Sequence, residues 1–193
     1  MTRSNGHARR YVVAAVAAVA AFAAVPASAS AGCKHKYSLP SEVSNATVKK
    51  TTLCLLNRQR RMHGRRALKA NRHLARAARK HALDMVDRKY FSHTSPGGAS
   101  FVDRIMRQDY VDPGEGWTLG ENLAWGSYQL ATPKSIVRSW MHSPGHRANI
   151  LNPAFREIGI GVVTGAPEAG TDHAATYATS FGRRFERPPG LTG

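Results

Sequence analysis

The sequence predicts an α+β protein in which an antiparallel sheet follows a group of helices. Apolar residues recur at the helical period in several segments of residues 47–142. Residues 158–163 alternate in the manner of a strand, and residues 174–181 form a second strand candidate. Hydrophobic residues make up 42% of the chain, enough for a packed core, which excludes wholesale disorder.

Capping residues and turn residues define the expected elements in order. A first helix should run from about Thr47 to His63 and end at Gly64, and a second should follow the N-cap Asn71. Ser100 can cap a third helix, and Pro133 is a suitable first residue for a fourth. Residues 111–116, rich in Gly, Pro and acids, are expected to form a loop.

Residues 1–29 have the pattern of a secretory signal peptide. Arg9 and Arg10 precede an apolar run over residues 11–25, and residues 27–29 supply the small side chains of a cleavage site. The paired arginines also leave twin-arginine export open. The run is shorter than the roughly 20 residues that span a bilayer, which disfavours a membrane anchor. We therefore expect a secreted or extracellular protein, associated with the cell envelope or free, whose mature form has no transmembrane anchor.

The two cysteines, Cys33 and Cys54, exclude a disulfide-dense scaffold and a four-cysteine zinc site. In an exported chain an even number of cysteines usually pairs, because the compartment is oxidising. We therefore predict a disulfide that ties residues 30–46 to the first helix. The alternative is a lipoprotein acylated at Cys33, for which the preceding small residues fit but Ser30 replaces the required large aliphatic residue.

Three motifs follow one another along the mature chain, which lacks repeats and long linkers. In this order and behind a signal peptide, they resemble the bacterial branch of the CAP superfamily, which includes cysteine-rich secretory proteins, antigen 5 and pathogenesis-related proteins. We expect this domain at residues 47–185, followed by a tail at 186–193. The motifs are Phe91-Ser92-His93-Thr94, Gly120-Glu121-Asn122-Leu123-Ala124, and residues 143–153 running into 155–161.

The resemblance implies a three-layer α-β-α sandwich with a central antiparallel sheet and a cleft where histidines and acids meet. The family's two histidines correspond to His93 and His146, and its first glutamate corresponds to Glu121. The family's second glutamate follows a tryptophan, but here Trp140 is followed by Met141, His142 and Ser143. A two-carboxylate mechanism is therefore in doubt, and the sequence does not show whether Glu157 replaces the missing acid.

The residues themselves support a site at His93, Glu121 and His146. His93 lies in a polar loop, where a histidine has no packing role and is either a site residue or an ordinary surface histidine. Glu121 precedes an apolar segment, where a carboxylate can act as a general base or serve structure alone. Two imidazoles, His93 and His146, would hold zinc or another divalent ion only weakly, since a catalytic zinc normally has three protein ligands. Pro144 should end the preceding helix at Ser143 and leave His142 exposed.

The net charge of +16 predicts affinity for polyanions. Residues 84–193 contain eleven basic and eleven acidic residues, whereas residues 43–83 contain twelve basic residues and no acid. Because like charges repel, this concentration suggests a basic face for an anionic cell-envelope polymer or lipid surface rather than a merely solvated one. No sequence-specific nucleic-acid partner is expected. The residues chosen to test this face are Arg65, Arg66, Arg72, Arg76 and Arg79.

Three function classes follow from these observations. The resemblance favours a non-enzymatic binding domain, because CAP domains are associated with lipid, sterol or cell-surface binding and share no agreed reaction. The second class is a hydrolase or protease that uses His93, Glu121 and His146, with or without a weakly held metal. The third is a polyanion binder that acts through charge alone.

Overall fold

The computed structural model describes Met1 and residues 32–186, so the predicted signal peptide beyond Met1 and the tail beyond Glu186 lie outside the described residues. Residues 32–186 contain five α-helices and four strands in one mixed α+β unit. The helices are α1 (Asn45–Met62), α2 (Arg72–Asp87), α3 (Phe101–Met106), α4 (Pro133–His142) and α5 (Pro144–Leu151). The strands are β1 (Lys69–Ala70), β2 (Glu115–Ser127), β3 (Glu157–Thr164) and β4 (Ala174–Glu186).

The sheet has the strand order β1-β3-β4-β2, and the three long strands pair antiparallel as predicted. The two-residue strand β1 pairs parallel with β3, between the two helices that were expected to end at Gly64 and to begin after Asn71. Strand β2 also corrects two expectations. It begins at Glu115, inside the expected loop 111–116, and it places Glu121 in mid-strand opposite Ser180 rather than at the edge of an element.

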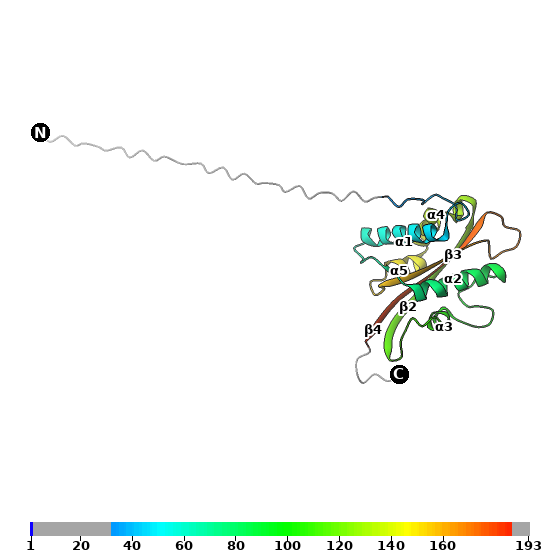
Figure 1. Ribbon diagram of the computed structural model, residues 1–193. Helices are drawn as coiled ribbons and strands as arrows, with labels where there is room; N and C mark the ends of the chain where they lie inside the picture. Colours follow the sequence, from blue (N-terminus) through cyan, green and yellow to red (C-terminus); the bar gives the residue numbers. More distant parts are fainter. Residues whose placement is uncertain (2–31, 187–193) are drawn as a thin grey trace. The chain divides into compact units, whose positions relative to one another are not determined.

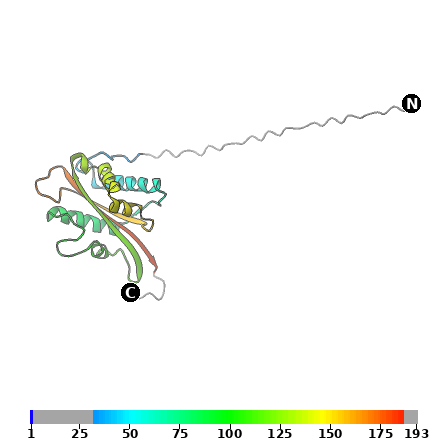
Figure 2. The ribbon, with the colours of Figure 1, turned by 180° about the vertical axis from the view of Figure 1, so that it is seen from behind.

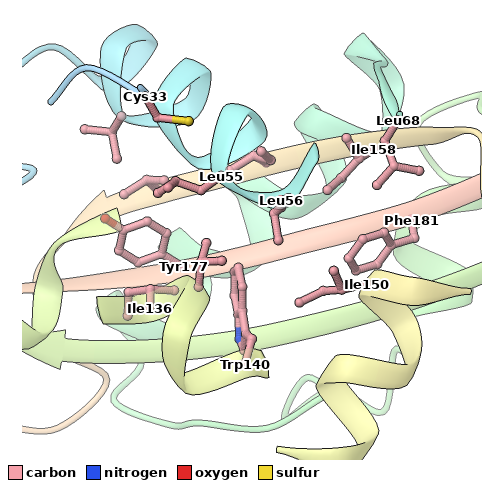
Figure 3. Close-up of a cluster of buried hydrophobic side chains, with 14 of the residues drawn as sticks. Cys33, Leu55, Leu56, Leu68, Ile136, Trp140, Ile150, Ile158, Tyr177 and Phe181 are labelled. Carbon is pink, nitrogen blue, oxygen red and sulfur yellow. The ribbon is translucent and has the colours of Figure 1, made fainter. Parts of the chain in front are cut away.

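Helices cover both faces of the sheet, which confirms the three-layer sandwich (Figures 1 and 2). Helices α1, α4 and α5 share one core with the sheet, in which Leu56, Trp140, Tyr177 and Phe181 are fully or almost fully buried (Figure 3). On the other face, α2 and α3 pack around smaller clusters that include Ala78 and Ile105.

The alternation in β3 explains how closely α2 approaches the sheet. Ile158 and Ile160 point into the core beneath α1, whereas Gly159 and Gly161 face α2. A Cβ atom at Gly159 would overlap the backbone of Leu74, so the helix packs directly on the strand backbone. This contact fixes α2, and with it the loop that follows α2 and carries His93.

Cys33 and Cys54 form the predicted disulfide, which fastens the segment before α1 to the middle of that helix. The sulfur that a lipoprotein anchor would use is therefore part of a structural cross-link. No helix in residues 32–186 is long and apolar enough to cross a membrane.

Replacing both cysteines by serine should lower the free energy of unfolding by about 3 kcal/mol, because the cross-link closes a loop with a sequence separation of 21 residues. Urea denaturation of the wild type, of Cys33→Ser/Cys54→Ser and of reduced wild type measures this. Equal midpoints for all three proteins, or an acyl group on Cys33 in the mass spectrum of the secreted protein, would contradict the prediction.

Candidate functional site

Glu121 is buried in the sheet and is paired on both oxygens. Its side chain is only 2% exposed, and Arg104 Nη2 lies 3.0 Å from Oε1 and 2.9 Å from Oε2. His93 Nδ1 lies 2.9 Å from Oε1, and the His93 side chain is 54% exposed. A buried carboxylate thus joins a largely buried arginine to a histidine that faces solvent.

Arg104 also fastens the loop that carries His93. A capping box between Ser100 and Asp103 starts α3 and sets the position of Arg104 on it. From there the guanidinium donates to the backbone oxygens of Ala99 and His93, each at 2.9 Å. The sequence does not single out Arg104, because an arginine on a short helix gives no signal of its buried partner.

His146 lies on α5, whose start agrees with the predicted helix break. Helix α4 ends at His142 and α5 begins at Pro144, so His142 and His146 do not share one helix face although they are four residues apart. His142 is exposed, as expected, and its ring bonds the oxygen of Arg138. His146 Nδ1 lies 2.8 Å from the Oγ atom of Ser143.

Two asparagines attach α5 to the strand that carries Glu121. Asn122, fully buried, donates to the backbone oxygen of His146 at 3.0 Å. Asn149 donates to the oxygen of Glu121 at 3.1 Å and to Asn122 Oδ1 at 2.9 Å. Asn149 therefore bonds the backbone of β2. Asn122 was missed because a polar residue inside a strand does not reveal what it contacts.

The two histidines lie close enough to influence each other electrostatically. Burial lowers the pKa of His146 below its usual 6.5, and the charge of His93 lowers it further. The folded protein therefore binds this proton less readily than the unfolded chain does. As a result, the contribution of His146 to stability is lost as the pH falls below 6.5 toward the pKa of the folded state.

His93→Gln should raise the pKa of His146, because it removes the neighbouring charge, but should leave that pKa below 6.5, because burial is the larger cause. A proton NMR titration of the imidazole resonances measures the change. His142→Gln, on the exposed end of α4, is the control and should leave the His146 curve unchanged. A His146 pKa that does not respond to His93→Gln would show that the two rings are uncoupled.

The donor set does not fit a catalytic metal centre. No group of three or more His, Cys, Asp or Glu side chains that could hold an ion occurs among the described residues. Each site imidazole uses its Nδ1 atom for a protein contact, which leaves the Nε2 atoms of His93 and His146 for a ligand. Two such atoms suit a loosely held ion at most, because a catalytic zinc normally has three protein ligands.

Glu157 does not take the place of the missing family acid. Its Oε1 atom accepts from Asn71 at 2.8 Å and its Oε2 atom accepts from Tyr110 at 2.8 Å, so it is bonded to the N-cap residue of α2 and to the segment after α3. Neither histidine of the site contacts it. The Ser143–His146 contact likewise has no carboxylate orienting the ring within residues 32–186, which leaves it short of a nucleophilic triad.

The basic segment, residues 43–83, places ten of its twelve basic residues at exposed positions; Lys49 is half-buried and Arg60 is buried. Lys49 and Lys50 of α1 and Arg72 of α2 line one hollow of about 500 Å³, so the cations of the two helix layers meet at the sheet edge near β1. We call this surface the basic face. Its five test residues, Arg65, Arg66, Arg72, Arg76 and Arg79, are all exposed.

Arg60, counted with the basic segment in the sequence, is instead fully buried. Its guanidinium donates to the backbone oxygens of Arg66 and Ile150, each at 2.6 Å, and to those of Asn152 and Phe155 at 3.1 and 3.4 Å. Burial lowers its pKa, and the charges of Arg156 and Arg65 lower it further. Arg60 therefore serves the core rather than the basic face.

Comparisons with known proteins agree with this architecture. The model of the cysteine-rich secretory protein (CAP) family matches residues 53–179. The uncharacterized protein YkwD of Bacillus subtilis (strain 168) is 40% identical over 126 residues, which cover 65% of this chain and 46% of YkwD. The uncharacterized membrane protein YlbC of the same organism is 34% identical over 116 residues, which cover 60% of this chain and 32% of YlbC. The chain thus spans less than half the length of these relatives.

Solved structures share the fold. An extracellular SCP-domain protein from Bacillus anthracis str. Ames superposes with a TM-score of 0.54 at 26% identity, covering 72% of this chain and 43% of that one. An outer surface protein from Borrelia burgdorferi gives a TM-score of 0.62 at 21% identity, covering 74% of this chain and 97% of that one. At that identity the second likeness shows the fold alone.

Proposed function

This chain belongs to the cysteine-rich secretory protein (CAP) family, and we propose that it is an extracellular binding domain that acts at the cell envelope rather than a hydrolase. The observation that carries the proposal is the environment of Glu121. A general base needs an oxygen free to take a proton from a substrate or water. Both Glu121 oxygens are bonded to Arg104 and one also to His93, in a side chain that is only 2% exposed.

The basic face supplies the binding surface in this proposal. The segment that carries its exposed cations, residues 43–83, contains no Asp or Glu. These cations lie on both sides of the sheet edge near β1. Such a surface attracts an anionic envelope polymer through counterion release. An extracellular SCP-domain protein that shares the fold at 26% identity supports a location outside the cell.

Retention of the protein on isolated cell wall should weaken steeply between low and high salt, since each neutralised anion releases counterions. A variant with five arginines of the basic face changed to glutamine should elute at clearly lower salt. The matched control removes the same charge elsewhere, at Arg88, Arg107, Lys134, Arg138 and Arg147.

The control should elute close to the wild type. His146→Ala should also behave as the wild type, because His146 is not part of the basic face. The proposal would be overturned if retention changed neither with salt concentration nor with the basic-face substitutions. Equal losses in the two five-residue variants would show that net charge alone acts.

A loosely held divalent ion at His93 and His146 is a second candidate, favoured by the lowered pKa of His146, because a ligating imidazole must be neutral. Zinc added at pH 7.5 should shift the resonances of both rings in the NMR titration described above, and the effect should fade below about pH 6.5. An unchanged spectrum at millimolar zinc would remove the candidate.

A further inference from the structure

A second hollow lies where the loop before β1 meets the first residues of β2 and β3 and the last residues of β4. Its volume is about 570 Å³, within the range of small-ligand sites. Five cationic side chains and two carboxylates line it, and its remaining lining residue is the small Ala67. The charged lining consists of Arg66, Lys69, Arg156, Arg183 and Arg184 with Glu115 and Glu157.

Three of these arginines come from the part of the sequence whose charges balance. Residues 84–193 carry equal numbers of basic and acidic residues, yet folding brings Arg156, Arg183 and Arg184 beside Arg66 and Lys69 of the basic segment. The hollow is therefore a concentration of positive charge that the distribution of charge along the chain does not reveal.

Three of the four arginines of the hollow are held in place by contacts with residues that do not line it. Arg156 Nη1 donates to the backbone oxygens of Ala154 and Phe155. Arg183 lies over the ring of Phe185, with its Cζ atom 5.6 Å from the ring centroid, and Arg184 lies over Tyr110 at 5.1 Å. Groups fixed before binding lose less conformational entropy when a ligand arrives.

Both carboxylates of the hollow have partners of their own. Arg184 lies 3.9 Å from oxygens of Glu115 and Glu157, and Glu157 also accepts hydrogen bonds from Asn71 and Tyr110. By contrast, no ion pair within residues 32–186 involves Arg66, Lys69 or Arg183. Positive charge therefore remains available at the hollow after the internal pairs are formed.

We propose that this hollow, which we call the phosphate hollow, binds a phosphate group of a phosphodiester polymer. Four of its five cations are arginines, whose planar guanidinium matches the oxygens of a phosphate in a bidentate manner. The scarcity of apolar lining gives an acyl chain nothing to contact, and a recess admits a flexible polymer more readily than a flat bilayer surface. The inference rests on the proposed function: the basic face attracts the polymer, and the phosphate hollow selects its chemistry.

The test compares two variants that lose the same charge. Lys69→Gln/Arg183→Gln changes the phosphate hollow, and Arg76→Gln/Arg79→Gln changes exposed positions on α2. Binding to a fluorescent glycerol-phosphate oligomer and to polyglutamate of similar charge is measured by anisotropy at one salt concentration. Circular dichroism checks that both variants fold.

The hollow variant should bind the glycerol-phosphate oligomer about tenfold more weakly than the α2 variant does, whereas the two variants should bind polyglutamate equally. Equal binding of the oligomer by both variants would overturn the inference. So would a loss of binding to phosphatidylglycerol vesicles as large as the loss for the oligomer, since a lipid headgroup would then be the ligand.

Cell-wall retention separates this inference from the proposed function. A hollow variant that binds the oligomer as the wild type does, while the wild type is retained on cell wall in a salt-dependent manner, would refute only the phosphate hollow. A wild type that is not retained, but binds the oligomer through the hollow, would refute only envelope attachment by the basic face.

Discussion

Replacing the buried Arg60 by methionine should lower the free energy of unfolding by about 3–5 kcal/mol. Methionine fills much of the same space but cannot donate hydrogen bonds. The backbone oxygens of Arg66, Ile150 and Asn152 would then lose the donor that Arg60 supplies, whereas that of Phe155 would keep its bond from Arg156. Each buried polar group left unpaired carries the cost of its desolvation.

Arg61→Met is the matched control, because Arg61 is the next residue on α1 and is exposed. Its effect should stay within about 0.5 kcal/mol, as for surface substitutions in general. Urea denaturation followed by far-UV circular dichroism gives both values. Similar small losses in the two variants would mean that water replaces the Arg60 donors, and that the arginine is dispensable to the core.

Arg60 also connects the stability of the core to the candidate site. Two of its acceptors, the oxygens of Ile150 and Asn152, lie at the end of α5, the helix that carries His146. A protein that lacks this donor should therefore lose order in α5 before the sheet unfolds. Amide hydrogen exchange in residues 144–151 should rise more in Arg60→Met than exchange in β3 or β4.

The sequence predicted elements whose signals are local. The caps Asn71 and Ser100 start α2 and α3 as expected, and Pro133 is the first residue of α4. Strands β3 and β4 were predicted from alternation and composition. Cys33 and Cys54 could be paired because an exported chain with two cysteines offers one intramolecular combination.

The features that were missed depend on contacts between distant residues. Strand β2 was not predicted because Glu121 and Asn122 interrupt its apolar pattern, and only the fold shows that Arg104 and Asn149 satisfy them. Arg60 has the sequence context of a surface cation, yet its acceptors lie 90 or more residues away along the chain in three of four cases. The phosphate hollow is likewise assembled from both halves of the chain.

Glu121→Gln should lower the free energy of unfolding by about 3 kcal/mol, because it leaves Arg104 with a charge that is mostly removed from water and has no carboxylate partner. The Arg104 side chain is 10% exposed, and both of its contacts with the carboxylate would lose their ionic character. His93→Gln should cost much less, since the His93 side chain is 54% exposed.

A double variant, Glu121→Gln/Arg104→Gln, distinguishes a structural pair from a functional acid. If the pair serves structure, the double variant should be more stable than the sum of the two single losses implies, because neither charge is then left alone. Cell-wall retention per folded molecule should stay at the wild-type level in Glu121→Gln, in Arg104→Gln and in the double variant, when it is measured well below their melting temperatures. Should Glu121→Gln instead keep its stability and lose retention, the carboxylate would be part of the binding surface, and the structural role proposed for Glu121 would be wrong.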